Sequence, residues 1–451
     1  MIGTRTWASF TFAPALLILL LPTLAWAQVE FEREPINYYQ HPVTDPIARL
    51  QKALDAGKIK LEYDEERGYL PALLRALEIP QSSQMLVFSK TSFQLRKISP
   101  LRPRAIYFSD DVYIGWVQRG DVIEITAVDP QLGAVFYTLD QEKTDTPRFV
   151  RDRGQCTTCH ALSRTQGVPG HLVRSVYPDR AGQPLLGSGT FTTDHRSPFE
   201  ERWGGWYVSG THGAMRHMGN VMVQDRNRPE ALDREAGANV TDLQPLVNTS
   251  PYLEPTSDIV ALMVLEHQTQ MHNFLTLANY EARSAAHYDA VMNEAFGRPA
   301  DHQTETTQRR IASAGEKLLQ YLLFTDEFAL TAPVQGVSKF AEEFAAAGPR
   351  DRQGRSLRDL DLERRLFKYP CSYLIYSDSF DALPASIKSY LTRRLLEVLK
   401  GEDRTPAFAH LSDVDRRNIL EILQDTKPEL FAPSPAKSAE PPEADMGQTA
   451  S

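Results

Sequence analysis

Residues 105–139 read AIYFSDDVYIGWVQRGDVIEITAVDPQLGAVFYTL. β-Branched and aromatic residues fill short runs in this stretch, and Asp, Gly, Gln and Pro are concentrated between the runs. The first group favours strands and the second favours turns. Short strands with such short connections are typical of an antiparallel meander. The expected strands are 85–88, 105–108, 112–117, 122–128 and 134–139.

Helical patterns flank this meander on both sides. Two short patterns precede it, at 45–56 and 70–77. A longer one runs from Ser257 past Tyr280, with apolar residues recurring at three- and four-residue steps. Pro384 and Gly401 bracket another, and Ser412 is a good N-cap for the last. The sequence therefore predicts an α+β fold, with a β-rich N-terminal region and an α-helical C-terminal region.

Changes in composition divide the chain into segments. Residues 148–228 are rich in Gly, His and Trp and show little periodicity, which predicts a loop-rich segment that carries function. The expected divisions are 1–27 as a signal peptide, 28–147 as the β-rich α+β region, 148–228 as the loop-rich segment, 229–431 as a mainly helical region and 432–451 as a flexible tail.

The N-terminus has the features of an export signal. Arg5 precedes a mostly apolar run of about a dozen residues, which is shorter than the roughly 20 that a membrane-spanning helix needs. Ala25-Trp26-Ala27 then matches the small-x-small pattern of a signal-peptidase site. We expect cleavage after Ala27 and a periplasmic protein with no integral membrane span in its mature form.

Charge and cysteine content exclude several classes of protein. The formal net charge is −9, which disfavours sequence-independent binding to nucleic acid. The three cysteines, Cys156, Cys159 and Cys371, are too few for a disulfide-stapled scaffold.

Residues 156–160 are Cys-Thr-Thr-Cys-His, the C-x-x-C-H pattern of c-type haem attachment. Two thiols at this spacing can add to the two vinyl groups along one edge of the porphyrin, and the adjacent His160 can turn its imidazole to the iron. A redox-active C-x-x-C pair would call for a βαβ context, and structural zinc would call for four ligands; the surrounding sequence offers neither. The cofactor expected is one covalent haem c, bound through Cys156, Cys159 and His160.

The segment from Cys156 to His160 resembles the attachment motif of single-haem c-type cytochromes. This resemblance implies iron that cycles between its ferrous and ferric forms and a protein that passes electrons. Most of the chain lies outside the resemblance, and a simple electron shuttle does not require so much additional protein.

The sequence leaves the sixth iron ligand open. Small cytochromes c usually take it from a methionine downstream of the motif, and Met218 is the leading candidate. Five of the eleven histidines fall between residues 160 and 217, so a histidine is an alternative. The other candidates are His171, His195, His212 and His217, or an open iron.

Several further residues have both a functional and a structural interpretation. Arginines near the motif could bind haem propionates, although surface charge is the simpler account of any one of them. His267 falls on the apolar face of the long helix and is expected to be a core histidine with its hydrogen bonds satisfied. Cys371 has no partner and is expected to be a buried, inert thiol. The arginines considered are Arg153, Arg164, Arg174 and Arg202.

Three functions remain open from sequence alone. The first is an exported haem c protein that transfers electrons through one covalent haem, with a redox partner protein. The second is a haem enzyme or a gas or redox sensor with an open or displaceable sixth ligand, which the length of the chain favours. The third is a structural or binding module of a larger periplasmic assembly, in which the haem acts as a relay. The sequence does not indicate an oligomeric state or decide whether the chain is an enzyme.

Overall fold

The computed structural model describes residues 30–431. The predicted signal peptide (1–27) and the predicted C-terminal tail (432–451) both lie outside this range. The strands are β1 Met85–Val87, β2 Arg104–Phe108, β3 Val112–Val117, β4 Val122–Asp129, β5 Gly133–Asp140, β6 Phe149–Arg151, β7 Val173–Val176 and β8 Thr190–Thr193. The α-helices are α1 Pro46–Asp55, α2 Leu70–Ala76, α3 Thr157–His160, α4 Ile259–Phe296, α5 Glu305–Leu322, α6 Phe340–Ala346, α7 Asp378–Asp381, α8 Ala385–Leu399 and α9 Asp413–Thr426.

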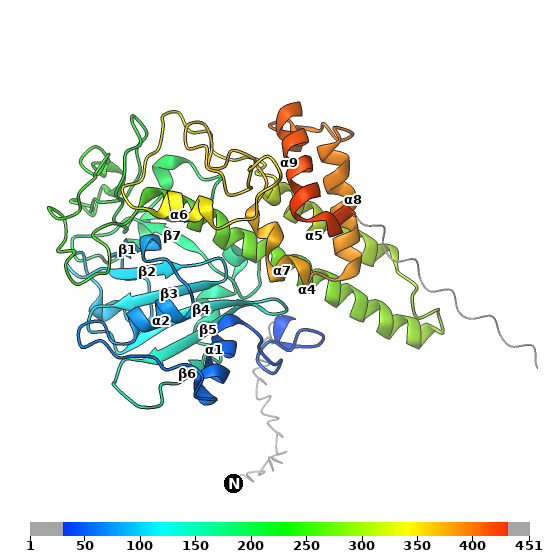
Figure 1. Ribbon diagram of the computed structural model, residues 1–451, viewed down its shortest axis with the longest axis horizontal. Helices are drawn as coiled ribbons and strands as arrows, with labels where there is room; N and C mark the ends of the chain where they lie inside the picture. Colours follow the sequence, from blue (N-terminus) through cyan, green and yellow to red (C-terminus); the bar gives the residue numbers. More distant parts are fainter. Residues whose placement is uncertain (1–29, 432–451) are drawn as a thin grey trace, which may run out of the picture.

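The predicted α+β fold is confirmed. Strands β1 to β6 form one antiparallel sheet in sequence order, which is the expected meander (Figure 1). The sequence did not predict its last strand, β6, which pairs with β5 and carries the sheet past residue 147. Helices α5, α8 and α9 lie together at the far end of α4 from the sheet (Figure 1).

Each face of the meander packs into a different core. Side chains alternate between the faces along a strand, and paired residues on neighbouring strands share a face. One face, including Tyr107, Ile114, Ile125 and Tyr137, packs with α1 and α2. The other face contributes residues such as Phe108 to the core that surrounds α4 and the C-terminal helices. We call this second face the α4 face.

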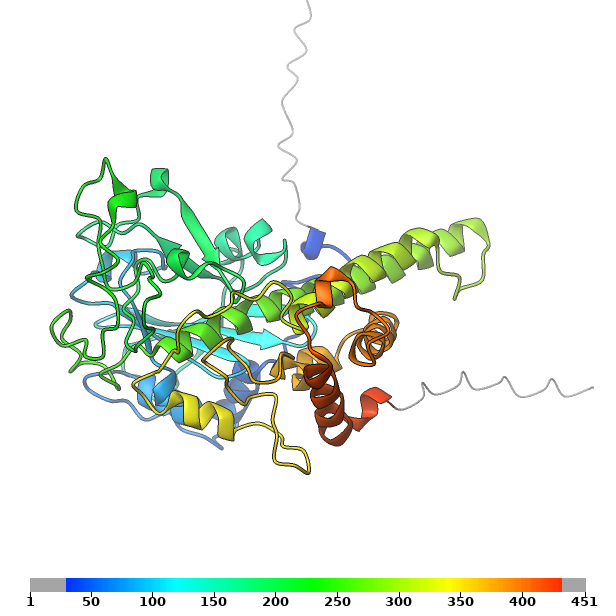
Figure 2. The same cartoon turned by 90° about the horizontal axis from the view of Figure 1, so that it is seen from above.

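Helix α4 is the central element of the molecule. Figure 2 shows it passing from the sheet outward beyond the globular body. Its first turns are buried on all sides, including the polar run of residues 266–270 and the polar residues His272 and Asn273. A helix that is buried all round is normally apolar all round, so these polar side chains need partners inside the protein.

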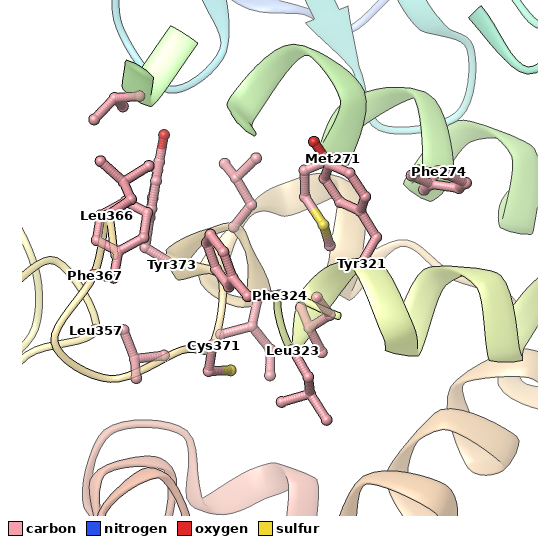
Figure 3. Packing of buried hydrophobic residues seen from close by; sticks show 14 of the residues in the cluster. Met271, Phe274, Tyr321, Leu323, Phe324, Leu357, Leu366, Phe367, Cys371 and Tyr373 are labelled. Atoms are coloured by element: carbon pink, nitrogen blue, oxygen red, sulfur yellow. The ribbon is translucent and has the colours of Figure 1, made fainter. Parts of the chain in front are cut away.

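The C-terminal core closes around Cys371. This residue is fully buried and packs in the same cluster as Phe324, Leu357 and Phe367 (Figure 3). Burial raises the pKa of its thiol far above the ordinary value. Both findings confirm the expectation of a buried thiol. No helix within residues 30–431 combines the length and apolar character needed to cross a bilayer.

Asp258 joins the start of α4 to a distant loop. One carboxylate oxygen caps the helix by accepting from the N–H groups of Val260 and Ala261, at 2.8 and 3.4 Å. The other accepts from the N–H groups of Val337 and Ser338 and from the Ser338 hydroxyl, each at 2.8 Å. The side chain is 1% exposed, so water cannot replace it.

We therefore expect Asp258→Ala to lower the free energy of unfolding by about 3 to 5 kcal/mol, the sum of a lost cap and orphaned backbone donors. Asp258→Asn keeps one oxygen acceptor but turns its NH2 group toward the donors on the other side, so it should cost less than the alanine variant without restoring the wild-type stability. Urea unfolding followed by circular dichroism measures both values. Equal losses in the two variants would contradict this account.

Candidate haem-binding site

The C-x-x-C-H motif forms a single turn directly after the last strand of the meander. Asp152 starts the turn, since one of its carboxylate oxygens accepts from the N–H groups of Gly154 and Cys156, both at 3.0 Å. The N–H groups of Cys159 and His160 then donate to the Cys156 carbonyl, at 3.1 and 3.0 Å. The structure thus places Cys159 and His160 on α3 and Cys156 at its N-cap.

The two nitrogens of the His160 ring have different environments. Nδ1 lies 3.1 Å from the carbonyl oxygen of Gly170, which can only accept, so Nδ1 carries the proton. Nε2 has no hydrogen-bond partner among residues 30–431. Burial lowers the pKa of His160 and favours the neutral ring. A neutral imidazole with Nδ1 donating to a carbonyl presents its Nε2 lone pair, as metal-ligating histidines do.

Helix α4 fixes the loop that carries this carbonyl. The Asn273 side chain accepts from the N–H of His171 at 2.8 Å and donates to the His171 carbonyl at 2.7 Å. Gln270 donates to the Arg164 carbonyl at 3.2 Å and accepts from Asn273 at 3.1 Å. The orientation of His160 therefore depends on polar side chains more than a hundred residues away in the sequence.

Gly170 is required by this arrangement. A Cβ atom added there would lie 2.1 Å from the side-chain oxygen of Asn273, which is too close for any other residue. The N–H of Gly170 also donates to the carbonyl of His160, at 2.8 Å. Gly170 and His160 therefore exchange two hydrogen bonds, one donated by the Gly170 N–H and one by the His160 ring.

Part of the α4 face of the sheet lies beside the motif. The His160 ring packs on Phe136 of β5, with ring centroids 5.1 Å apart. Glu124 lies close enough to affect the pKa values of both His160 and Cys156. The register places one cross-strand row next to these residues: Ile106, Gly115, Glu124, Thr138 and Val150. We call this row the sheet floor.

The sheet floor is unusually open for the middle of a sheet. Ile106, Glu124 and Thr138 are partly exposed, and Val150 is 62% exposed. Gly115 has no side chain, and the ion pair from Arg104 to Glu124, at 2.7 Å, spans it. Glycine inside a strand often marks the close approach of a ligand. A partly apolar, partly exposed floor beside two cysteines and an available histidine fits a porphyrin.

The electrostatics of Cys156 disfavour a redox-active dithiol. Burial, together with the nearby Asp152 carboxylate, raises the pKa of its thiol to about 12. Catalytic C-x-x-C pairs instead need a lowered pKa to form a thiolate. Within residues 30–431 there is no cluster of three or more His, Cys, Asp or Glu side chains placed to hold a metal ion.

Met218 lies in a small core of its own. It is fully buried with Tyr177, Val223 and Leu232, and its sulfur lies 3.8 Å from the Ser175 hydroxyl. None of these neighbours is among the hydrogen-bond or ring partners of His160. The role of Met218 as an iron ligand therefore stays a prediction.

Two of the alternative ligands have hydrogen bonds that hold them elsewhere. His212 lies 2.8 Å from the Met215 carbonyl through Nδ1 and accepts from the N–H of Asn239 through Nε2, at 3.0 Å. His217 accepts from the N–H of Gly219 through Nδ1, at 3.0 Å. Their positions are explained by local loop structure.

His171 differs from the other candidate ligands. It is 6% exposed, and both ring nitrogens are buried without a partner in the described chain. Its ring packs on Tyr113 at 4.3 Å and lies 5.9 Å from His272. It follows Gly170, whose carbonyl holds His160, so the two histidines belong to one loop.

The arginines that the sequence offered as propionate ligands differ in their partners. Arg202 is 3% exposed and forms a buried ion pair with Glu266 of α4, at 3.0 Å, so its partner is a protein carboxylate. Arg174 donates to the Thr190 hydroxyl at 2.9 Å. Sequence reasoning missed Arg104, which extends over the sheet floor and has a buried Nε without a partner in the described chain. Arg104 lies within a strand, and nothing in the sequence around it indicates that its side chain would lie over the sheet floor.

A buried pair of histidines joins the loop-rich segment to α4. Nδ1 of His195 lies 2.9 Å from Nδ1 of His267, and Nε2 of His267 lies 2.7 Å from the Ser372 hydroxyl. Phe324 and Tyr321 enclose the pair. The expectation that His267 is a core histidine with satisfied hydrogen bonds is confirmed. The polar partners of this helix were missed from sequence, and the run EHQTQMHN at 266–273, inside an otherwise apolar helix, was the available signal.

Comparison with known proteins gives no relative. No protein family, curated protein or solved structure matches this chain.

The histidine pair predicts loss of stability in acid. Burial lowers the pKa of His195 and His267 well below 6.5, so below that pH the unfolded chain binds more protons than the folded protein. Each such histidine contributes up to about 1.4 kcal/mol per pH unit. The free energy of unfolding should therefore fall as the pH drops from 7 to 5.

The variant His267→Gln tests the origin of this effect. It removes one titrating group from the pair and should make the fall with pH shallower, as read from urea unfolding at several pH values. His302→Gln removes an exposed histidine and should keep the wild-type dependence. An unchanged slope in His267→Gln would show that the pair is not responsible.

Proposed function

We propose that this chain is an exported haem c protein that transfers electrons through one covalently attached haem. The observation that carries the proposal is the His160 ring, whose Nδ1 is held by Gly170 while its Nε2 stays without a partner on the turn of Cys156 and Cys159. Metal-ligating histidines have this arrangement, in which one ring nitrogen donates its proton to a carbonyl and the other presents its lone pair.

The chain's own residues have distinct roles in this proposal. Each thiol, of Cys156 and of Cys159, adds its S–H across one vinyl C=C bond, so two thioethers form with no net loss of atoms or electrons. His160 supplies the proximal nitrogen, and Gly170 keeps its proton on Nδ1. The haem, when bound, supplies one-electron chemistry. Arg104 offers an unused Nε–H donor to a propionate at the sheet floor.

The second axial ligand proposed is Met218, with His171 as the alternative that the structure favours among the histidines. A methionine ligand raises the reduction potential and a histidine lowers it. With both axial positions held by side chains, no ligand has to leave when an electron moves, which suits transfer to a partner protein. The expected export signal places such a partner in the periplasm.

Covalent attachment is the first test. Protein matured in a host that assembles haem c should show a mass increase of one haem, and acid-acetone should not extract its colour. Cys156→Ala combined with Cys159→Ala should abolish both signals, because no thiol remains to form a thioether. Cys371→Ala is the matched control and should keep the haem, since that thiol is buried in the distant core. Haem that extracts from the wild type would overturn the proposal.

The variant Met218→Ala tests the sixth ligand. If Met218 binds the iron, the ferric wild type shows the weak near-infrared sulfur-to-iron band, and the variant loses it and binds CO readily when reduced. Truncating a fully buried methionine should also lower the free energy of unfolding by about 2 to 5 kcal/mol. A variant with that loss of stability but an unchanged spectrum would assign Met218 to packing, and the same measurements on His171→Ala would then be decisive.

A further inference from the structure

The loop between β1 and β2 exposes an unusual set of apolar side chains. It leaves the sheet from its edge strand and spans residues 88–103. Phe93 is 65% exposed, Leu95 44% and Leu101 76%. Phe93 and Leu101 stand at turns, where side chains project from the surface. Bulky apolar groups exposed this far on one short loop indicate a surface that contacts something else.

The same loop is positively charged in an acidic protein. Residues 88–103 contain no Asp or Glu, while the whole chain has a formal charge of −9. Lys90, Arg96 and Arg102 form no ion pair with any residue in the range 30–431. Arg119, on the neighbouring β3–β4 turn, is also without an ion pair there. Its carbonyl accepts from the Lys97 ammonium at 3.1 Å, which places the two segments side by side.

The loop is held in this conformation by specific hydrogen bonds. The Gln94 amide donates to the Val122 carbonyl at 2.9 Å and accepts from the N–H of Asp121 at 2.8 Å. The N–H of Lys90 donates to the Gly182 carbonyl at 2.8 Å, and Ser99 pairs with Arg102 across the turn that carries Leu101. The loop is therefore built around a buried glutamine, and its apolar residues are left outside.

We propose that the β1–β2 loop docks this protein on the surface of a bilayer that contains anionic phospholipid. Such a surface has anionic headgroups above an apolar acyl region. The exposed apolar side chains of the loop would enter the boundary of the acyl region, and the unpaired cations beside them would bind the headgroups. An acidic protein surface would satisfy the cations, but it would leave Phe93 and Leu101, which project singly at separate turns, without pockets to fill.

This docking would bring the haem-binding site close to the membrane. Gln94 and Ser92 also donate to a carboxylate oxygen of Glu124, at 3.1 and 3.3 Å, and Glu124 belongs to the sheet floor. The loop thus connects the proposed membrane contact to the floor beside His160. The docking itself does not require haem, so it can fail or succeed independently of the proposed function.

Vesicle co-sedimentation of the purified mature protein tests the proposal. We expect binding to vesicles of phosphatidylethanolamine with phosphatidylglycerol, weaker binding as salt is raised, and little binding to phosphatidylcholine alone. Lys90→Gln, Arg96→Gln and Arg102→Gln together should weaken binding about 100-fold, at about fivefold per charge. Phe93→Ser with Leu101→Ser should weaken it about tenfold, because less apolar area enters the interface.

Two controls make the result decisive. Lys400→Gln with Arg417→Gln removes exposed cations from the helical region and should bind as the wild type does. Circular dichroism and thermal unfolding should show that the loop variants stay folded, since the substituted side chains are partly or fully exposed. The proposal would be overturned if the wild type does not bind vesicles that contain phosphatidylglycerol, or if the loop variants bind as tightly as the control variant. The exposed patch would then be assigned to a protein partner.

Discussion

The amide of Asn273 binds both the N–H and the carbonyl of His171, and this clasp joins α4 to the loop that orients His160. A side-chain amide can donate and accept in this way within one plane. The helix cannot rotate without breaking the clasp, and the loop cannot move without releasing the Gly170 carbonyl. The conformation of the motif therefore depends on a helix that lies far from it in the sequence.

The neighbours of Asn273 extend the same constraint through the molecule. Gln268 of α4 donates to the Ser109 carbonyl and to the Tyr113 hydroxyl, at 2.7 and 2.9 Å, and so fixes the helix to the meander. His267 reaches Ser372 in the C-terminal core. Each of these polar groups is buried, so breaking one contact leaves an unsatisfied group inside the protein. The sheet, the loop-rich segment and the C-terminal core meet through one polar stretch of one helix.

Sequence reasoning succeeded where the relevant information is local. Short runs of β-branched and aromatic residues, separated by Asp- and Gly-containing turns, predicted the meander, because each hairpin joins neighbours in the chain. The C-x-x-C-H motif could be recognised for the same reason, since it lies within five residues, and its role in haem attachment stays a prediction. Ser412 was predicted as an N-cap, and its hydroxyl accepts from the N–H of Asp415 at 3.1 Å. The strand β6 was missed because three residues carry too little pattern.

What escaped prediction depends on contacts between distant segments. No periodicity relates Arg202 to Glu266 or Arg104 to the sheet floor, because an ion pair has no sequence spacing when its members come from different elements. Gly170 shows the limit most clearly. Its lack of a side chain leaves room for the Asn273 oxygen, which lies 2.1 Å from where a Cβ would be, while its carbonyl directs the proton of His160. The same residue thus anchors the loop to α4 and orients His160, so a change at Asn273 or at Gly170 alters both the loop and the histidine.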